Sequence, residues 1–241
     1  AYAKERKQFG RPIGSFEMIQ KKFALAAAEC YAADAGWMTC AAMVDRGGVD
    51  FSLETAACKV FASELSLRAA LEAQQVAEEL GRAFKDPLRS LGAIGSYLGG
   101  RVKRQLAKPC FTRVHPALAD EAELVCKAVH DLALAVEKLL IAHGKGVIER
   151  QFHQERLANA AIDIYLSTAT LSRTSWAIAR AGGPENAAAD LDNARIFVTM
   201  AMRRTRRALR ALEANQDARL KAIAERALES GSLTVDTPTD A

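Results

Sequence analysis

Aromatic residues are scarce in this sequence, proline is rare, and no long apolar run is present. Aromatic residues make up 6% of the 241 residues, six residues are proline, and half of the chain is apolar. Alanine is abundant and runs of β-branched residues are few, a composition that favours helices. No apolar stretch reaches the ~20 residues that span a bilayer. The composition therefore predicts an all-α protein without a membrane-spanning helix.

Patterns for metal sites and disulfide frameworks are absent too. There is no C-x-x-C pair, and the four histidines are scattered. We expect the cysteines to be buried apolar thiols in a reducing compartment, with no metal site. A net charge of +4 is too small to indicate nucleic acid. The cysteines are Cys30, Cys40, Cys58, Cys110 and Cys126.

Apolar residues at steps of three and four predict two long helices in the first third of the chain. The first runs from the N-cap candidate Ser15 to Arg46, and Gly47-Gly48 ends it. The second runs from about Ser52 to Leu80. The apolar stripe expected to face the core of the first helix is Phe16, Ile19, Phe23, Ala27, Cys30, Ala33, Trp37, Cys40 and Val44.

Further helices are predicted after Pro116, at 117–143, 186–212 and 217–228. Another predicted helix lies between the first two of these, and its apolar spacing is the most regular in the chain. That pattern alternates steps of four and three, as in the seam of a helix bundle. Gly182-Gly183-Pro184 ends it, and residues 231–241 are predicted to form a polar tail. The seam residues are Leu157, Ala161, Ile164, Thr168, Leu171, Ser175 and Ile178.

Two basic segments each leave two interpretations open. From Arg82 to Pro116, glycines interrupt an apolar pattern and basic residues outnumber the one acid, Asp86. This pattern is typical of a helix that lies in a membrane interface, and it also fits a connector whose charges are solvated. A ridge of arginines on helix 186–212 either meets an anionic membrane or acidic partner, or is a solvated face, which we favour. No aromatics interleave with the ridge (Arg203, Arg206, Arg207 and Arg210), so nucleic acid is not expected.

The segment Arg6-Lys7-Gln8-Phe9-Gly10-Arg11-Pro12-Ile13-Gly14-Ser15-Phe16-Glu17-Met18-Ile19-Gln20 resembles a family signature. That signature is R-x-Q-F-G-x-P-I-x-x-F-x-x-I-Q, which opens the C-terminal helical domain of the acyl-CoA dehydrogenases. The resemblance implies that Arg6 binds the FAD pyrophosphate of a neighbouring subunit, that Gln8 adds a hydrogen bond, and that Phe9 packs by the cofactor. An arginine fork suits this role because it binds phosphate bidentately. Phe16 and Gln75 are further candidate FAD contacts. Phe16 matches a ring on the adenine side, and Gln75 matches the first residue of a family glycine turn whose glycines are absent here.

Lys59-Val60-Phe61-Ala62-Ser63-Glu64 is similar to the K-x-F-A-S-E helix of the same family. In the family this helix leads to a Q-I-x-G-G-x-G turn, an R-D-x-R-I segment and an E-G-T motif. None of the three follows Ala77 here. In the matching branch of the family the E-G-T glutamate is the catalytic base, so we assign no catalytic residue. Either the complete protein holds a segment missing from this sequence, or the molecule lacks the base.

Later segments resemble the extra C-terminal domain of very-long-chain acyl-CoA dehydrogenases. They are Val114-His115-Pro116-Ala117-Leu118, His143-Gly144-Lys145-Gly146-Val147-Ile148 and Gln154-Glu155-Arg156-Leu157-Ala158. The chain begins at Ala1 within a helical pattern, so we expect it to be part of a longer protein. The expected organisation is an acyl-CoA dehydrogenase C-terminal bundle (1–80), a candidate membrane-contact linker (81–115), the extra helical domain (116–230) and a flexible tail (231–241).

The resemblance implies an FAD-dependent oxidoreductase that converts long or very long chain fatty acyl-CoA to trans-2-enoyl-CoA in β-oxidation. It also implies a homodimer that passes electrons to an electron-transfer flavoprotein. The expected location is peripheral to the inner membrane, on the mitochondrial matrix or bacterial cytoplasmic side. The alternative is a non-catalytic paralogue that acts as an assembly or partner subunit.

Overall fold

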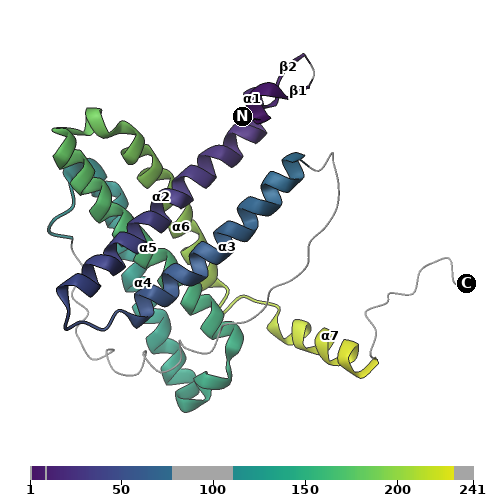
Figure 1. Ribbon diagram of the computed structural model, residues 1–241. Coiled ribbons are helices and arrows are strands. Elements are labelled where there is room, and N and C mark those ends of the chain that lie inside the picture. Colours follow the sequence, from purple (N-terminus) through teal and green to yellow (C-terminus); the bar gives the residue numbers. More distant parts are fainter. Residues whose placement is uncertain (1, 9, 78–110, 231–241) are drawn as a thin grey trace, which may run out of the picture.

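The computed structural model describes residues 2–8, 10–77 and 111–230, and helices account for nearly all of its regular structure (Figure 1). The predicted all-α class is confirmed, apart from one hairpin of two-residue strands. The elements in chain order are α1 (Tyr2–Glu5), β1 (Lys7–Gln8), β2 (Arg11–Pro12), η1 (Ile13–Ser15), α2 (Glu17–Arg46), α3 (Ser52–Ala77), η2 (Pro116–Leu118), α4 (Ala119–His143), η3 (Gly144–Glu149), α5 (Gln151–Ala181), η4 (Pro184–Ala187), α6 (Ala188–Arg210) and α7 (Asp217–Ser230), where η denotes a 3₁₀ helix.

Helix α5 lies at the centre of the bundle, against α2, α3, α4 and α6 (Figure 1). Its predicted seam is buried at Leu157, Ile164, Leu171 and Ile178, as the spacing indicated. Burial extends well beyond the seam, because neighbouring helices cover other sides of α5 as well. The core that results contains residues of α2, α3, α4, α5 and α6 together. The predicted bundle (1–80) and the predicted extra helical domain (116–230) therefore contribute residues to the same core.

The buried face of α2 differs from the prediction. The expected stripe contained Phe23, Trp37 and Val44, and these side chains are 59%, 66% and 53% exposed. The buried residues are instead mostly small, namely Ala28, Tyr31, Ala32, Ala35, Gly36 and Cys40. Small residues let α2 lie close to α5 and α6, and in an alanine-rich helix the large apolar residues do not mark the packed face.

Gly36 is a point of close approach between α2 and its neighbours. A Cβ atom there would lie 2.5 Å from Cδ2 of Leu166 and 3.1 Å from Sγ of Cys58. Beside it, the Tyr165 hydroxyl donates to the Gly36 carbonyl over 3.0 Å and lies 3.2 Å from Sγ of Cys40. The thiols of Cys40 and Cys58 are 3.7 Å apart and free. Burial raises the pKa of Cys58 to about 12, so this thiol stays protonated.

Several predictions concern residues that the structure does not describe. The linker (81–115) lies largely, and the tail (231–241) wholly, outside the described residues, so these boundaries stay predictions. Within the described residues, no helix is long and apolar enough to cross a membrane. The predicted helix 217–228 is confirmed as α7, which projects from the bundle at the lower right of Figure 1.

Candidate functional site

The motif that resembles the family signature folds into a small corner at the free end of α2 (Figure 1). Strands β1 and β2 pair antiparallel, with Gln8 opposite Arg11. Gly10 has φ +79° in the two-residue turn, a conformation that glycine adopts without a Cβ penalty. The amide of Ile13 donates to the carbonyl of Arg6 over 2.9 Å, and Ile13 itself is buried. These contacts hold the corner as a defined unit.

Ser15 does not cap α2, contrary to the prediction. Its hydroxyl donates to the carbonyl of Pro12 over 2.7 Å. Residues 13–15 form one 3₁₀ turn, and Phe16, in an extended conformation, takes the N-cap position before Glu17. The hydroxyl therefore stabilises the turn after Pro12, and the helix begins one residue later than a Ser15 cap would place it.

The corner presents cationic side chains beside the aromatic ring of Phe16. Arg6, Gln8 and Arg11 are exposed, and Phe16 is half-buried. The guanidinium carbon of Arg11 lies 4.1 Å from the centroid of the Phe16 ring, which is within the range of a cation–π contact. Sequence reasoning missed Arg11, although its position five residues before Phe16 was visible in the motif.

Phe9 and Gln75 are the two remaining candidate FAD contacts. Phe9 lies outside the described residues. Gln75 lies near the C-terminal end of α3. Helices α2 and α3 pack side by side and antiparallel, so this end of α3 lies at the same end of the pair as the hairpin (Figure 1). The backbone thus brings four of the five candidates to one end of the α2–α3 pair.

A diphosphate group fits the donors at this corner. Gln8 and Arg11 are opposite each other in the hairpin and Arg6 directly precedes it, and all three side chains are exposed. Charge-assisted donors of this kind recognise phosphate oxygens, and an arginine-covered ring provides a flat surface beside them. Among the described residues, no cluster of His, Cys, Asp or Glu is arranged to hold a metal ion.

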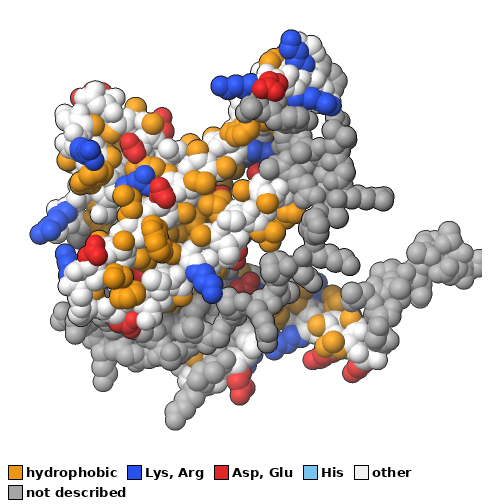
Figure 2. Space-filling model, viewed as in Figure 1, with side chains coloured by type: hydrophobic (Ala, Val, Ile, Leu, Met, Phe, Trp, Pro, Cys, Tyr) orange, Lys and Arg blue, Asp and Glu red, His pale blue; other side chains and the backbone are white. Residues whose placement is uncertain are grey.

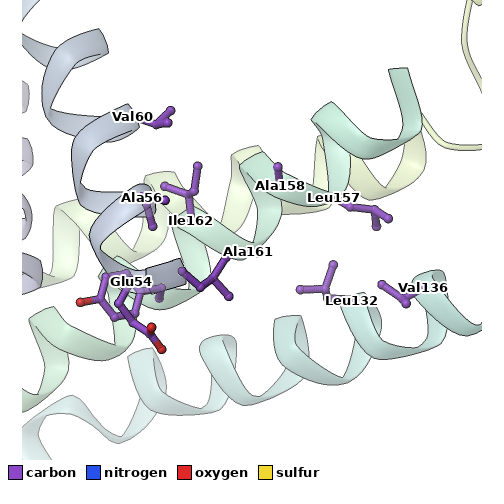
Figure 3. A pocket seen from close by; sticks show the side chains of 12 residues that line it. Glu54, Ala56, Val60, Leu132, Val136, Leu157, Ala158, Ala161 and Ile162 are labelled. Carbon is purple, nitrogen blue, oxygen red and sulfur yellow. The ribbon is translucent and has the colours of Figure 1, made fainter. Parts of the chain in front are cut away.

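The bundle also encloses an apolar cavity of about 130 Å³ between α3, α4 and α5 (Figure 3). Leu132 of α4 and Leu157 of α5 line it, with the carboxylate of Glu54 at one side. The volume is close to the roughly 150 Å³ that accommodates benzene in another protein. This cavity is too small for a long acyl chain.

One carboxylate of α2, that of Glu29, takes part in an ion-pair network. Glu29 lies 3.1 Å from Arg68 and 3.9 Å from Arg204. Sequence reasoning missed Asp163, which is 6% exposed and accepts two hydrogen bonds from Arg204, of 3.1 and 2.7 Å. These contacts tie α2, α3, α5 and α6 together. They are structural, because both arginine partners are engaged within the bundle.

Comparison with family models identifies both halves of the chain. Residues 1–86 match the acyl-CoA dehydrogenase C-terminal domain. Residues 116–233 match the ACAD9/ACADV C-terminal domain. The chain belongs to the acyl-CoA dehydrogenase family. The resemblance inferred from the motifs is thereby confirmed, including the likeness to the very-long-chain branch.

Curated relatives agree with the family models. The chain is 27% identical over 225 residues to the human very long-chain specific acyl-CoA dehydrogenase, mitochondrial, covering 72% of this chain and 34% of that protein. Over 76 residues it is 46% identical to the probable acyl-CoA dehydrogenase YngJ of Bacillus subtilis (strain 168), covering 32% of this chain and 20% of that one. The chain thus spans about a third or less of the length of these relatives.

The fold has a counterpart among solved structures. An acyl-CoA dehydrogenase from Bacillus anthracis, complexed with FAD, matches with a TM-score of 0.62 at 18% sequence identity. The match covers 98% of this chain and 49% of that one. At this identity the likeness establishes the fold.

Proposed function

We propose that this chain is the C-terminal helical part of an FAD-dependent acyl-CoA dehydrogenase that oxidises long or very long chain fatty acyl-CoA to trans-2-enoyl-CoA. The observation that supports this is the basic corner, where Arg6 precedes the hairpin that contains Gln8 and Arg11, and Arg11 lies over the Phe16 ring. The match of residues 116–233 to a domain named for ACAD9 and ACADV supports the very-long-chain preference.

In this proposal the corner binds the diphosphate of FAD and leaves the redox chemistry to the cofactor, which accepts a hydride from the acyl chain. Arg6 holds the diphosphate by charge-assisted hydrogen bonds, and Gln8 adds a neutral one. Arg11 keeps the Phe16 ring in a fixed orientation, so that the ring forms a wall beside the adenine end. No described residue takes the role of catalytic base.

An apolar face along α2 and α3 supports the proposed homodimer. Figure 2 shows hydrophobic side chains gathered along both helices on this side of the molecule. We propose that a second subunit and the rest of the polypeptide cover this face, and that the complete enzyme passes electrons to an electron-transfer flavoprotein. The half-exposed or more exposed side chains are Met18, Phe23, Trp37, Met38, Val44, Leu67 and Leu71.

The proposed location is peripheral to the inner membrane, on the matrix or bacterial cytoplasmic side. The relatives named above include a mitochondrial enzyme, and the segment Arg82–Lys108 has the basic, glycine-interrupted apolar pattern of an interfacial segment. That segment lies outside the described residues, so its contact with lipid is proposed from sequence.

The second candidate function is a non-catalytic paralogue that acts in assembly. The observation that favours it is the absence of an E-G-T motif after Ala77 in the sequence. The intact mass of the complete protein, or its full encoded sequence, separates the two. An E-G-T segment between the K-x-F-A-S-E helix and the C-terminal domain supports the enzyme, and a true deletion supports the paralogue.

Arg6→Ala in the complete protein tests the flavin assignment. A charge-assisted phosphate contact contributes about 1.5–3 kcal/mol, so FAD affinity should fall roughly tenfold to hundredfold. Arg46→Ala is the matched control, because Arg46 is also exposed but lies at the opposite end of α2. Flavin absorbance after gel filtration measures retention. Equal flavin content in the Arg6 and Arg46 variants would contradict the assignment.

A further inference from the structure

Two free thiols from adjacent helices lie in contact where α2 packs against α3. Sγ of Cys40 in α2 and Sγ of Cys58 in α3 are 3.7 Å apart. The two residues are 18 positions apart in the chain, on either side of the loop that joins the helices (Figure 1). A disulfide bond is about 2.04 Å long, so the sulfur atoms need to approach each other by about 1.7 Å to form one.

Neighbouring groups hold both sulfur atoms at this contact. Gly36 leaves room for the sulfur of Cys58, because a Cβ atom on Gly36 would lie 3.1 Å from that Sγ. The Tyr165 hydroxyl donates its proton to the carbonyl of Gly36 and lies 3.2 Å from Sγ of Cys40. The tyrosine oxygen is therefore left to accept from the thiol of Cys40. Each sulfur is thus kept on the side of its helix that faces the other sulfur.

The two thiols differ in their access to solvent. Cys40 is 2% exposed, whereas Cys58 is partly exposed. A small oxidant in solution can reach Cys58, and the buried thiol of Cys40 meets only its neighbour. This is the arrangement of a thiol that is oxidised first and a second thiol that resolves the product.

We propose that Cys40 and Cys58 form a reversible disulfide across the α2–α3 contact when the protein is exposed to a peroxide. The sulfur of Cys58 attacks one peroxide oxygen, the O–O bond breaks, and Cys58 becomes a sulfenic acid with release of one water. The sulfur of Cys40 then attacks the sulfur of Cys58, the S–O bond breaks, and a second water leaves. Two thiols lose two electrons and two protons, and one peroxide is reduced to two waters. This reaction goes beyond the proposed flavin chemistry and does not depend on it.

Other roles for the pair fit the geometry less well. A bound metal ion needs more than two ligands from the protein or solvent, and among the described residues no group of three or more His, Cys, Asp or Glu is placed to hold one. The Tyr165 hydroxyl proton is engaged by the Gly36 carbonyl, so the phenol is not set up as a metal ligand. Two thiols that served only as apolar filling would not need to face each other and a hydroxyl group.

Burial sets the speed of the reaction. It raises the pKa of Cys58 to about 12, a rise that Cys40 and Glu54 reinforce and Tyr165 opposes. The thiolate is the reactive form, so oxidation at neutral pH is slow and requires sustained exposure to the peroxide. The rate should rise about tenfold per pH unit between about pH 7 and 9, whereas an unburied thiol with a pKa of about 8.5 levels off in this range.

The test is peptide mapping of the complete protein after incubation with hydrogen peroxide, with the remaining thiols blocked before digestion with trypsin. Cleavage after lysine and arginine places Cys40 in peptide 23–46 and Cys58 in peptide 47–59, so the disulfide joins two peptides. Exposed Cys30 lies in the first of these peptides, which makes Cys30→Ser the matched control. We expect the joined peptides in Cys30→Ser and none in Cys58→Ser, and dithiothreitol should separate them.

Urea unfolding of the oxidised and reduced protein gives a second readout. A disulfide that closes a loop of this length lowers the population of the unfolded chain roughly a hundredfold, so the oxidised protein should unfold at a higher urea concentration. Oxidation of Cys58 to a sulfinic or sulfonic acid without joined peptides overturns the proposal. Pairing of Cys40 with a cysteine other than Cys58 overturns it as well, as does oxidised protein that unfolds at lower urea than reduced protein. Flavin content plays no part in these readouts, so failure here leaves the proposed function untouched.

Discussion

Replacing Arg204 by methionine should destabilise the bundle strongly, because it leaves a carboxylate buried without its partner. Asp163 lies on the centre of α5 with a side chain 9% exposed, and it accepts two hydrogen bonds from Arg204 of α6. Breaking a buried pair costs about 3–5 kcal/mol. The Arg204 side chain is 37% exposed, so water partly compensates, and we expect a loss of about 2–3 kcal/mol.

Removing both charges should restore most of that loss. In the double variant Arg204→Met with Asp163→Leu, no ionised group remains buried at this point of the α5–α6 contact, and such replacements are often neutral. Glu29 keeps its contact with Arg68 at 3.1 Å. Arg195→Met is the matched control. Its partner Glu121 is 3.7 Å away and Arg195 is 47% exposed, so the expected loss is below about 1 kcal/mol.

The loss in Arg204→Met should depend on pH in a defined direction. Burial raises the pKa of Asp163, and the hydrogen bonds from Arg204 oppose that rise. Without Arg204 the pKa rises further, so the folded state binds a proton that the unfolded state releases above its ordinary value of 3.8. Stability of the variant should therefore fall as pH increases from that value through the raised pKa. The penalty is smallest in acid and full at neutral pH.

Urea unfolding followed by far-ultraviolet circular dichroism measures these differences. A loss of 2–3 kcal/mol corresponds to roughly 5–10 °C in melting temperature for a chain of this length. The reasoning is refuted if Arg204→Met loses no more stability than Arg195→Met. It is also refuted if the double variant is as unstable as the single one, since the cost would then lie in lost packing rather than in an unpaired charge.

Two further changes test the packing around α2. Gly36→Ala should lose about 1 kcal/mol net in urea unfolding, because overpacking against fully buried Leu166 costs about 1–3 kcal/mol and the gain in helix propensity returns about 1. Gly146→Ala, with nothing within 4 Å of the added Cβ, should be neutral, and equal losses would contradict the close approach. In the folded protein, iodoacetamide should modify exposed Cys30 much faster than Cys58, whose pKa burial raises to about 12. Mass spectrometry of the two thiols measures this, and equal rates would show that the α2–α3 contact opens readily.

Helix positions could be predicted from the sequence where the apolar periodicity and the flanking glycines or polar turns gave the same boundaries. The predicted helices at 117–143 and 217–228 appear as α4 and α7, since glycines or polar turns bound each amphipathic stripe. The packed face of α2 could not be predicted in the same way. Alanine occurs on every side of that helix, so the large residues decided the expected stripe, whereas Gly36 and its small neighbours decided the real one.

The candidate site was predictable in part. The motif located the corner and its turn, because glycine permits the positive φ seen at Gly10 and Pro12 restricts its own φ. It did not reveal that Arg11 would cover the Phe16 ring. It also could not show the pair between Asp163 and Arg204, which are 41 residues apart. Contacts of that kind depend on how two helices are rotated against each other, and no local pattern encodes this rotation.

The position of the corner relative to the core explains why its cofactor would need a second surface. Burial on α2 begins at Ala28, and the eleven residues back to Glu17 extend about 16 Å at 1.5 Å per residue. Along that stretch Met18 and Phe23 are largely exposed, so the basic corner stands away from the bundle on one rigid helix (Figure 1). An exposed corner can supply donors to a diphosphate but cannot enclose it. A flavin held there must therefore be covered by protein outside the described residues, and the exposed apolar side chains of α2 are the surface against which that protein would pack.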